Sequence, residues 1–328
     1  MHSDGIWCLD MPNTKVAVLD DYQYNAESLA DWSSLAGVTT VFFHDHIADL
    51  DQLVARLEAF AVVVVIRERT WFGADLIRQL PNLRLLVTIG MWNAAIDLEA
   101  AKARNIVVSG TESRGSDATP ILSWSLILGI TRNLQVEAAS VKAGGWQVGT
   151  GVDLPGKTLA LLGLGKIGQV VARYGHAFNM RIIAWSQNLT AEKAAEHGAE
   201  YVQKEELFRQ ADILSVHLIL SDRTRGLVGE RELRLMKPSA YLVNTSRGPI
   251  VSEPALIAAL QSGTIKGAAL DVFDQEPLPA CHPFRFLPNV LATPHIGYVT
   301  ENTYTTAFRQ IVEDIRAWLD GKPIRVMS

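Results

Sequence analysis

Short apolar runs alternate with amphipathic segments along the first hundred residues. The run Val62–Ile66 contains only β-branched residues, which is typical of a strand buried on both faces. In contrast, Ala48–Phe60 repeats its apolar residues at helical spacing. The same criteria predict strands at Lys15–Leu19, Val38–Phe43, Arg84–Ile89 and Ile106–Val108, and helices at Ala26–Leu35, Asp75–Leu80 and Leu98–Arg104.

The alternation stops at Ser109–Thr119, a stretch rich in Gly, Ser and Thr that we interpret as a crossing between domains. Thr119-Pro120 then predicts a helix with Thr119 as its N-cap, running to about Ser140. A second alternating set follows, so we predict an α/β protein with two doubly wound domains. The later strands are predicted at Arg181–Trp185, Ile213–His217, Tyr241–Val243 and Gly267–Val272, and the later helices at Ala191–His197, Glu253–Gln261 and Thr303–Leu319.

A glycine-rich turn lies at the start of this second set. Apolar residues Leu159–Leu162 run directly into Gly163-Leu-Gly-Lys-Ile-Gly168, and a helix-like segment follows. A strand, a tight turn and a helix start are the order of a dinucleotide-binding βαβ unit. Gly163 permits the turn, Gly165 lets backbone N–H groups approach a pyrophosphate, and Gly168 lets the helix pack closely on its strand. The phosphates then lie at a helix N-terminus, which favours an anion.

The overall composition limits the kinds of molecule that this chain is expected to bind. A net charge of −5 at pH 7 gives no reason to expect nucleic acid or an anionic membrane. The longest apolar runs are too short to span a bilayer, and the first ten residues lack a basic region followed by an apolar core. The two cysteines, Cys8 and Cys281, have no metal-ligand spacing and indicate a reducing compartment. We therefore expect a cytoplasmic enzyme without a bound metal.

Three further strings follow the ends of predicted strands in the second domain, at the edge where α/β sheets bind ligands. They are Asn244-Thr-Ser-Arg-Gly248, Asp271-Val-Phe-Asp-Gln-Glu-Pro277 and Thr293-Pro-His-Ile-Gly297. Together they supply a fixed cation, carboxylates and a titratable imidazole.

These strings and the glycine turn, in this order, resemble the D-isomer-specific 2-hydroxyacid dehydrogenase family over nearly the whole chain. The resemblance implies a Rossmann NAD(P)-binding domain at residues 117–298, inserted into a flavodoxin-like substrate-binding domain formed by residues 1–116 and 299–328. It also implies a homodimer, for which we expect the apolar stretch Ile121–Ile130 to form the interface.

The resemblance further implies the site residues. The catalytic set falls on Arg247, Glu276 and His295, and the small 2-oxo or 2-hydroxy acid substrate is expected to contact Gly90, Met91 and Arg247. The expected cofactor contacts are Gly163, Gly165, Lys166, Ile167, Gly168, Ser186, Gln187, His217, Thr245, Ser246, Asp271 and Gly297.

The residue types suit hydride exchange between such an acid and NAD or NADP. Arg247 offers a planar, permanently charged fork to the substrate carboxylate. When a 2-oxo acid is reduced, its carbonyl oxygen gains negative charge and needs a proton, which the imidazole of His295 is suited to donate. Glu276 is expected to stabilise the imidazolium and fix its tautomer. In the oxidative direction, neutral His295 accepts the hydroxyl proton instead.

Two departures from the usual pattern concern specificity. Most NAD-binding units place an acidic residue on the ribose hydroxyls about 20 residues after the glycine turn, but Ser186 stands there in this chain and no Arg or Lys follows immediately. Both NAD and NADP therefore stay open. Tyr298, Trp71 and Trp92 predict an aromatic cleft wall and a preference for an apolar substrate over a phosphorylated one, unless these rings only pack the domain interface.

Other members of the fold family stay open as alternatives. An NAD(H)-sensing corepressor keeps the same fold and triad but acts as a binding module, and a phosphite-type dehydrogenase uses a similar triad. Formate dehydrogenases are disfavoured, because that branch resembles the family with Gln at the position of Glu276.

Overall fold

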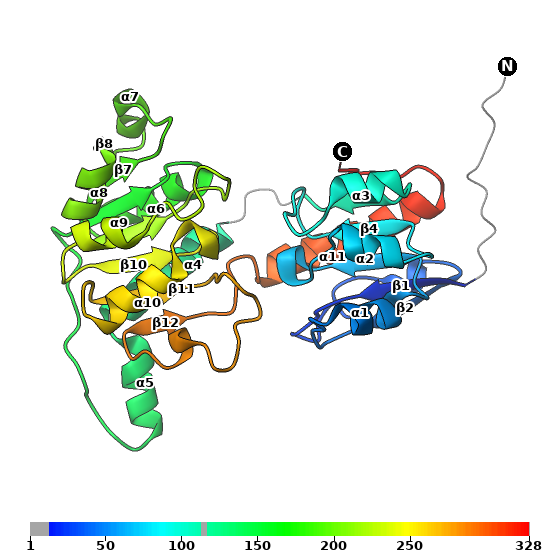
Figure 1. Cartoon of the computed structure of the whole chain (residues 1–328), viewed down its shortest axis with the longest axis horizontal. Coiled ribbons are helices and arrows are strands. Elements are labelled where there is room, and N and C mark those ends of the chain that lie inside the picture. The colour runs from blue at the N-terminus through cyan, green and yellow to red at the C-terminus, as the bar shows by residue number, and fades with distance from the viewer. Residues whose placement is uncertain (1–12, 113–116, 328) are drawn as a thin grey trace. The chain divides into compact units, whose positions relative to one another are not determined.

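The computed structural model describes residues 13–112 and 117–327 and divides the chain into two compact units (Figure 1). Unit 1 comprises Met1–Ser116 and Thr300–Ser328, and unit 2 comprises Asp117–Val299. Among the described residues, no helix has the length and apolar character needed to cross a bilayer. Cys8 and part of the predicted crossing, residues 113–116, lie outside the described residues.

The described part of unit 1 contains a five-stranded parallel sheet in the order β2-β1-β3-β4-β5. This is the flavodoxin-like order of doubly wound sheets. Its elements are β1 Thr14–Val18, β2 Val38–Phe42, α1 Leu50–Leu57, β3 Val62–Val65, α2 Ala74–Gln79, β4 Leu85–Thr88, α3 Leu98–Ala103, β5 Val107–Gly110 and α11 Glu301–Leu319.

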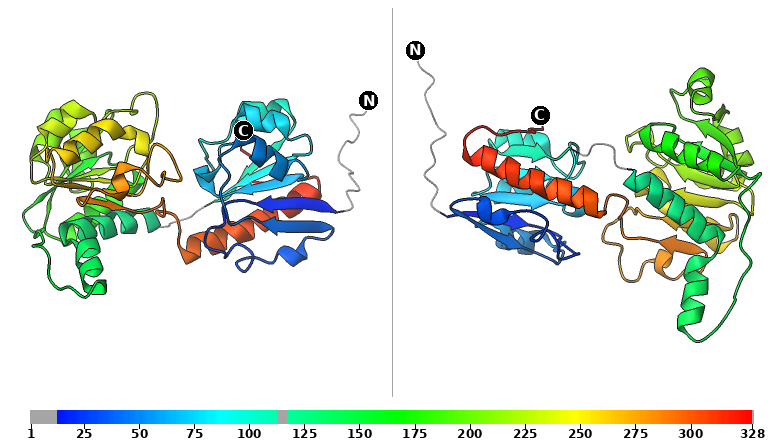
Figure 2. Two further views of the ribbon diagram at one scale, coloured as in Figure 1. Left: turned by 60° about the horizontal axis from the view of Figure 1, so that its bottom comes forward. Right: turned by 180° about the vertical axis from the view of Figure 1, so that it is seen from behind.

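Both faces of this sheet are covered. Val63 and Val65 point into a core with the buried side chains of α1 and α2, such as Leu57 and Ile77. The other face is packed by α11, which follows unit 2 in the sequence and lies along the strands of unit 1 in Figure 2. Coverage from both sides explains why β3 is apolar at every position.

The described part of unit 2 contains a seven-stranded parallel sheet in the order β12-β11-β10-β9-β6-β7-β8. Read from β8, this is the 3-2-1-4-5-6 order of a Rossmann sheet, with one further strand at the edge. Its strands are β6 Thr158–Leu162, β7 Arg181–Trp185, β8 Glu200–Tyr201, β9 Ile213–Val216, β10 Tyr241–Asn244, β11 Gly267–Leu270 and β12 Val290–Ala292. The strand orders confirm the predicted fold class.

The helices of unit 2 cover the two faces of its sheet according to the two-residue period of the strands. Leu159 and Leu161 pack with α4 and α6, whereas Ala160 and Leu162 pack with α8, α9 and α10. The helices are α4 Ala118–Thr131, α5 Leu134–Lys142, α6 Lys166–Ala177, α7 Ala191–Ala195, α8 Lys204–Gln210, α9 Glu230–Leu235 and α10 Glu253–Gln261.

The predicted helix Ala26–Leu35 is wrong. This segment forms turns and a single 3₁₀ turn at Trp32–Ser34. The carboxylate of Asp21 accepts hydrogen bonds from the backbone N–H of Ala26 (3.2 Å), and the indole N–H of Trp32 donates to the Ala26 carbonyl (2.9 Å). The bond from Trp32 occupies the carbonyl that would accept the first hydrogen bond of a helix beginning at Ala26.

The predicted long helix after the crossing is also corrected. It begins at Ala118, so Thr119 lies inside its first turn and does not cap it. It ends at Thr131 because Asn133 adopts a left-handed conformation (φ 53°), and α5 starts at the next residue. Asparagine is among the few residues that tolerate this conformation, so the chain turns at this point.

Candidate active site

The residues expected to carry chemistry lie at the carboxyl ends of the parallel strands of unit 2. The glycine turn follows β6, Ser186 follows β7 and His217 follows β9. Arg247, Glu276 and His295 follow β10, β11 and β12, which are adjacent in the sheet. The sheet therefore places the expected cofactor contacts and the expected catalytic residues along one edge.

The glycine turn requires glycine at its first and last positions. Gly163 has φ 107°, and a Cβ atom there would lie 2.8 Å from the carbonyl oxygen of His217. At Gly168, a Cβ atom would overlap the carbonyl oxygen of Gly163. The turn is thus closed tightly against β9 and α6, as a Rossmann turn requires.

The middle glycine has a different environment. Nothing lies within 4 Å of the position that a Cβ of Gly165 would take, immediately before α6 begins at Lys166. Lys166 and Ile167 are exposed beside it. The backbone N–H of Gly163 bonds the Trp185 carbonyl (2.9 Å), which ties the turn to the strand that leads to Ser186 and Gln187. An open helix N-terminus beside this strand end fits a dinucleotide pyrophosphate.

His217 is neutral in this setting. Its Nε2 lies 2.8 Å from the hydroxyl oxygen of Ser215, and burial lowers the pKa of its imidazole to about 4. Its side chain therefore carries no charge for a phosphate near neutral pH. Its backbone carbonyl, in contrast, forms the wall against which Gly163 turns.

His295 and Glu276 form a hydrogen-bonded pair. The imidazole Nδ1 lies 2.6 Å from Glu276 Oε2, and Glu276 Oε1 accepts a hydrogen bond from the backbone N–H of Phe273 (2.9 Å). Both carboxylate oxygens are therefore engaged, which fixes the imidazole in one orientation. The ring of Tyr298 meets the imidazole edge to face, with 5.5 Å between the centroids.

Asp271 organises the turn that carries His295. Its buried carboxylate accepts hydrogen bonds from the Thr293 hydroxyl (2.6 Å), the Ile296 N–H (2.8 Å) and the Gly297 N–H (2.9 Å). Burial raises the pKa of this carboxyl group, and the three donors act in the opposite direction. The sequence pattern did not reveal this positioning role, because the donors lie 22 to 26 residues further along the chain.

Arg247 is held by its neighbours on the loop after β10. Its guanidinium donates to the Ser246 carbonyl (2.7 Å), and the side-chain amide of Asn244 donates to the Arg247 carbonyl (3.0 Å). A Cβ atom at Gly248 would overlap the backbone of Phe273. Glycine at 248 therefore allows the Arg247 loop to pack directly on the loop of Glu276, a role that the Arg-Gly pair in the sequence could have signalled.

Three expected cofactor contacts have partners within the protein. The Thr245 hydroxyl lies 2.7 Å from the Ser123 hydroxyl on α4, and the Ser246 hydroxyl donates to the Leu218 carbonyl. Gly297 is buried, with its carbonyl accepting from the Thr119 hydroxyl (3.0 Å). The side chains of Thr245 and Ser246 thus have structural roles, and their contact with a cofactor stays a prediction.

The remaining expected contacts, Gly90 and Met91, lie in unit 1 after β4. Gly90 has φ 94°, and its N–H bonds the Thr111 hydroxyl (2.9 Å). A Cβ atom at Gly90 would overlap the guanidinium of Arg67, so this loop lies against a cation. Within the described ranges, no group of three or more His, Cys, Asp or Glu side chains is arranged to hold a metal ion.

Comparison with known proteins decides the family. A family model for the D-isomer specific 2-hydroxyacid dehydrogenase NAD binding domain matches residues 124–297. This chain belongs to that family. It is an NAD(P)-dependent oxidoreductase that interconverts 2-hydroxy acids and 2-oxo acids.

Individual relatives extend the match beyond the nucleotide-binding domain of the dehydrogenase. A glyoxylate reductase from Aeropyrum pernix is 41% identical over 274 residues, which is 81% of each chain. A crystal structure of a putative D-3-phosphoglycerate dehydrogenase from Ralstonia solanacearum superposes with a TM-score of 0.89 at 37% identity, covering 95% of this chain and 96% of the other. An acyclic imino acid reductase solved with NADPH and D-Arg gives a TM-score of 0.74 at 25% identity, covering 96% of this chain and all of the other.

Proposed function

We propose that His295 is the acid/base of this dehydrogenase, donating a proton to the carbonyl oxygen of a 2-oxo acid during reduction. The hydrogen bond between His295 Nδ1 and Glu276 Oε2 (2.6 Å) carries the proposal. With Nδ1 bonded to Glu276, Nε2 is the nitrogen that exchanges the proton with substrate. General acid catalysis of this kind contributes about 10²–10⁴-fold.

Gly163, Gly165 and the N-terminus of α6 would hold the pyrophosphate of a dinucleotide, and Ser186 with Gln187 would meet its adenosine ribose. Such a group would supply the hydride for reduction or accept it in the oxidative direction. Ser186 carries no charge that would repel a 2′-phosphate. The affinities of NADH and NADPH, titrated side by side, test this point, and we expect them to differ by less than about tenfold.

In unit 1 the backbone of Gly90-Met91 is the proposed binding site for the substrate carboxylate, and in unit 2 the guanidinium of Arg247 has the chemistry to pair with such a group. A guanidinium pairs with a carboxylate through two parallel hydrogen bonds, which fixes the orientation of the adjacent carbonyl. In this assignment unit 1 contributes the Gly90-Met91 loop to substrate binding, and unit 2 contributes the nucleotide site and the reactive side chains. The cytoplasmic location expected from the sequence stays a prediction.

Replacement of His295 by asparagine tests the proposal. Asparagine tolerates the left-handed backbone that His295 adopts (φ 51°), so the turn is kept while the proton donor is lost. We expect kcat/KM for 2-oxo acid reduction to fall about 10²–10⁴-fold, with an unchanged affinity for NADH. Turnover within threefold of the wild type would refute the assignment.

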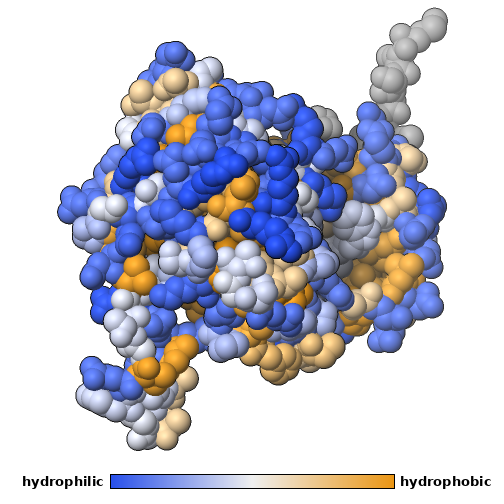
Figure 3. All heavy atoms as spheres, turned by 60° about the vertical axis from the view of Figure 1, so that its left-hand side comes forward, coloured by the Kyte–Doolittle hydropathy of each residue, from blue (hydrophilic) through white to orange (hydrophobic). Residues whose placement is uncertain are grey.

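We also propose that the enzyme is a homodimer, but through α5 and not through Ile121–Ile130. In the latter stretch Leu126 and Ile127 are buried in the core of unit 2, and Ile121 is the large apolar side chain that is exposed (54%). Exposed apolar side chains occur instead on α5 and the segment after it, and orange spheres lie on this projecting part at the lower left of Figure 3. They are Leu134, Val136, Val141, Trp146 and Val148.

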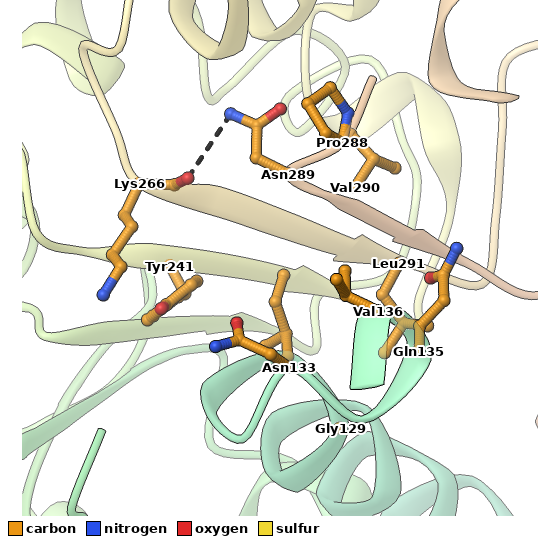
Figure 4. A pocket seen from close by; sticks show the side chains of 11 residues that line it. Gly129, Asn133, Gln135, Val136, Tyr241, Lys266, Pro288, Asn289, Val290 and Leu291 are labelled. Atoms are coloured by element: carbon orange, nitrogen blue, oxygen red, sulfur yellow. Dashed lines mark hydrogen bonds between the residues drawn. The ribbon is translucent and has the colours of Figure 1, made fainter. Parts of the chain in front are cut away.

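A groove borders this surface. It lies between the start of α5 and the amino ends of β10–β12, and Figure 4 shows Val136 and Leu291 on its apolar side. Lys266 approaches the ring of Tyr241 (5.4 Å to the centroid) at its other end. Trp146, 75% exposed, is the kind of side chain that anchors protein interfaces. Sedimentation of Trp146→Asp should show monomers where the wild type sediments as a dimer, and a dimeric variant would contradict this interface.

A further inference from the structure

Exposed apolar side chains gather at the carboxyl edge of the sheet of unit 1. They lie on the loops after β1 and β3 and on the loop after β4 that contains Gly90 and Met91. Trp71 is 68% exposed and Trp92 51%. We call this group the aromatic rim; it consists of Tyr22, Tyr24, Trp71, Met91 and Trp92.

The loops that carry the two tryptophans are joined to each other. The backbone N–H of Phe72 bonds the Ala95 carbonyl (2.7 Å), and the side-chain amide of buried Asn93 donates to the Arg67 carbonyl (2.8 Å). The indole of Trp71 lies over Gly73, where a Cβ atom would overlap its Nε1. Both tryptophans are therefore presented by one rigid pair of loops beside Gly90.

The charges at this edge do not favour a second anion on the substrate. The guanidinium of Arg69 is engaged with the Asp20 carbonyl (2.6 Å) and the Tyr304 hydroxyl (3.0 Å). Arg67 approaches the carboxylate of Glu68 (3.5 Å). The carboxylates of Asp20 and Asp21 are buried on the loop after β1, where His46 and His44 lie 2.9 Å and 3.4 Å from them. The two guanidinium groups are thus engaged by acceptors within the protein, which a phosphate dianion would have to displace.

We propose that the preferred substrate is a 2-oxo acid with a large, uncharged apolar or aromatic side chain, which Trp71, Met91 and Trp92 contact. This inference rests on the proposed function, in which the Gly90-Met91 loop holds the substrate carboxylate. A side chain attached next to the carbonyl then lies within reach of the rim on the same pair of loops. Its burial against indole rings strengthens binding in proportion to the apolar area removed from water.

A substrate panel with the purified full-length enzyme tests this inference. We compare kcat/KM for phenylpyruvate, 4-methyl-2-oxopentanoate, glyoxylate, hydroxypyruvate and 3-phosphohydroxypyruvate, and measure NADH binding separately. We expect the best apolar acid to exceed hydroxypyruvate and 3-phosphohydroxypyruvate by at least about tenfold.

Substitutions connect that preference to the rim. In Trp71→Ala and Trp92→Ala, the ratio of kcat/KM for phenylpyruvate to that for glyoxylate should fall about tenfold or more. Phe286→Ala is the matched control, because Phe286 is an exposed aromatic residue (71%) that precedes β12 in unit 2. We expect its ratio to equal that of the wild type.

The outcomes separate the two levels of the argument. Reduction of glyoxylate or 3-phosphohydroxypyruvate in preference to every apolar acid overturns the inference and leaves the proposed function in place. An unchanged ratio in both tryptophan variants also overturns it, and indicates that the rim packs against protein. Turnover of no 2-oxo acid by an enzyme that binds NADH overturns the proposed function and this inference together.

Discussion

Unit 1 and unit 2 each bury an aspartate directly beyond a parallel strand, and the two carboxylates have different tasks. In unit 2, Asp271 accepts three hydrogen bonds from a single turn, Thr293–Gly297, which carries His295. In unit 1, Asp20 accepts hydrogen bonds from Thr70 (2.5 Å) and Tyr22 (3.3 Å) and lies 2.9 Å from the imidazole of His46. Its partners therefore come from the loops after three strands.

The difference suggests how two domains of the same fold class can serve different purposes, one holding a reactive side chain and the other discriminating between substrates. A carboxylate that satisfies one turn fixes a single reactive group, whereas a carboxylate that joins several loops fixes the outline of a surface. In unit 2, Glu276 and His295 beyond the strands are paired with each other. In unit 1 the surface beyond the strands is aromatic around Gly90, with its charges tied to one another. We expect damage to Asp271 to reduce turnover and damage to Asp20 to alter discrimination between acids.

Of the two aspartates, Asp271 is expected to give the larger effect when it is replaced by alanine. The substitution leaves the N–H groups of Ile296 and Gly297 buried without their acceptor, which costs about 1–3 kcal/mol for each group. Because the His295 turn then loses its anchor, we expect kcat to fall at least about 100-fold, measured at saturating substrate. Calorimetry on the same sample gives the loss of stability. A turnover within threefold of the wild type would show that the turn Thr293–Gly297 keeps its conformation without the Asp271 carboxylate.

Asp20→Ala is the corresponding test for the buried aspartate of unit 1. It releases Thr70 and His46 from the loops beside the aromatic rim, while the residues of unit 2 are untouched. We expect KM for the preferred acid to rise about tenfold, as for a lost interaction worth 1.4 kcal/mol, with a smaller change in kcat. A fall in kcat as large as that of Asp271→Ala would erase the distinction between the two carboxylates.

A smaller, pH-dependent effect is expected for a charge pair away from both edges. Asp314 on α11 is buried, and Arg325 donates to it (2.8 Å). Burial raises the pKa of Asp314 from 3.8 to about 7, even though Arg325 acts in the opposite direction. The folded state therefore holds this proton more tightly than the unfolded state. Asp314 lowers the stability of unit 1 as pH rises from about 4 to about 7, and its effect is constant above that.

Removal of Arg325 enlarges this loss. In Arg325→Leu the buried carboxylate has lost its counterion, so we expect the free energy of unfolding to fall by about 3 kcal/mol at pH 8 and by less at pH 5. Urea melts at the two pH values measure the difference. Asp314→Asn, combined with Arg325→Leu, should remove the pH dependence; a loss of equal size at both pH values would assign it to packing.

The strands, and with them the fold class, could be predicted because their signal is local. Val62–Val65 and Leu159–Leu162 are apolar at successive positions, and the structure buries them all. The segment 26–35 could not be predicted, because the bonds that oppose a helix there involve Asp21 and the packed indole of Trp32.

In the candidate site, too, local sequence patterns could be predicted but contacts between distant residues could not. The strings around Arg247, Glu276 and His295 could be found because each follows a predicted strand and their order resembles that of the family. The positioning role of Asp271 depends on a turn 22 to 26 residues away. The role of Thr119 depends on Gly297, 178 residues along the chain. Contacts at such separations follow from how the chain packs, and no local period encodes them.

The position of α11 in the chain has a consequence for how the protein is made. Its residues Phe308, Ile311 and Ile315 are buried against a sheet whose strands were synthesised some two hundred residues earlier. During translation from the N-terminus, the nascent sheet of unit 1 waits with one apolar face uncovered while the whole of unit 2 emerges from the ribosome. Unit 1 has all its strands before unit 2 has any, but it lacks its last helix until unit 2 is complete, so unit 1 is the last of the two to mature.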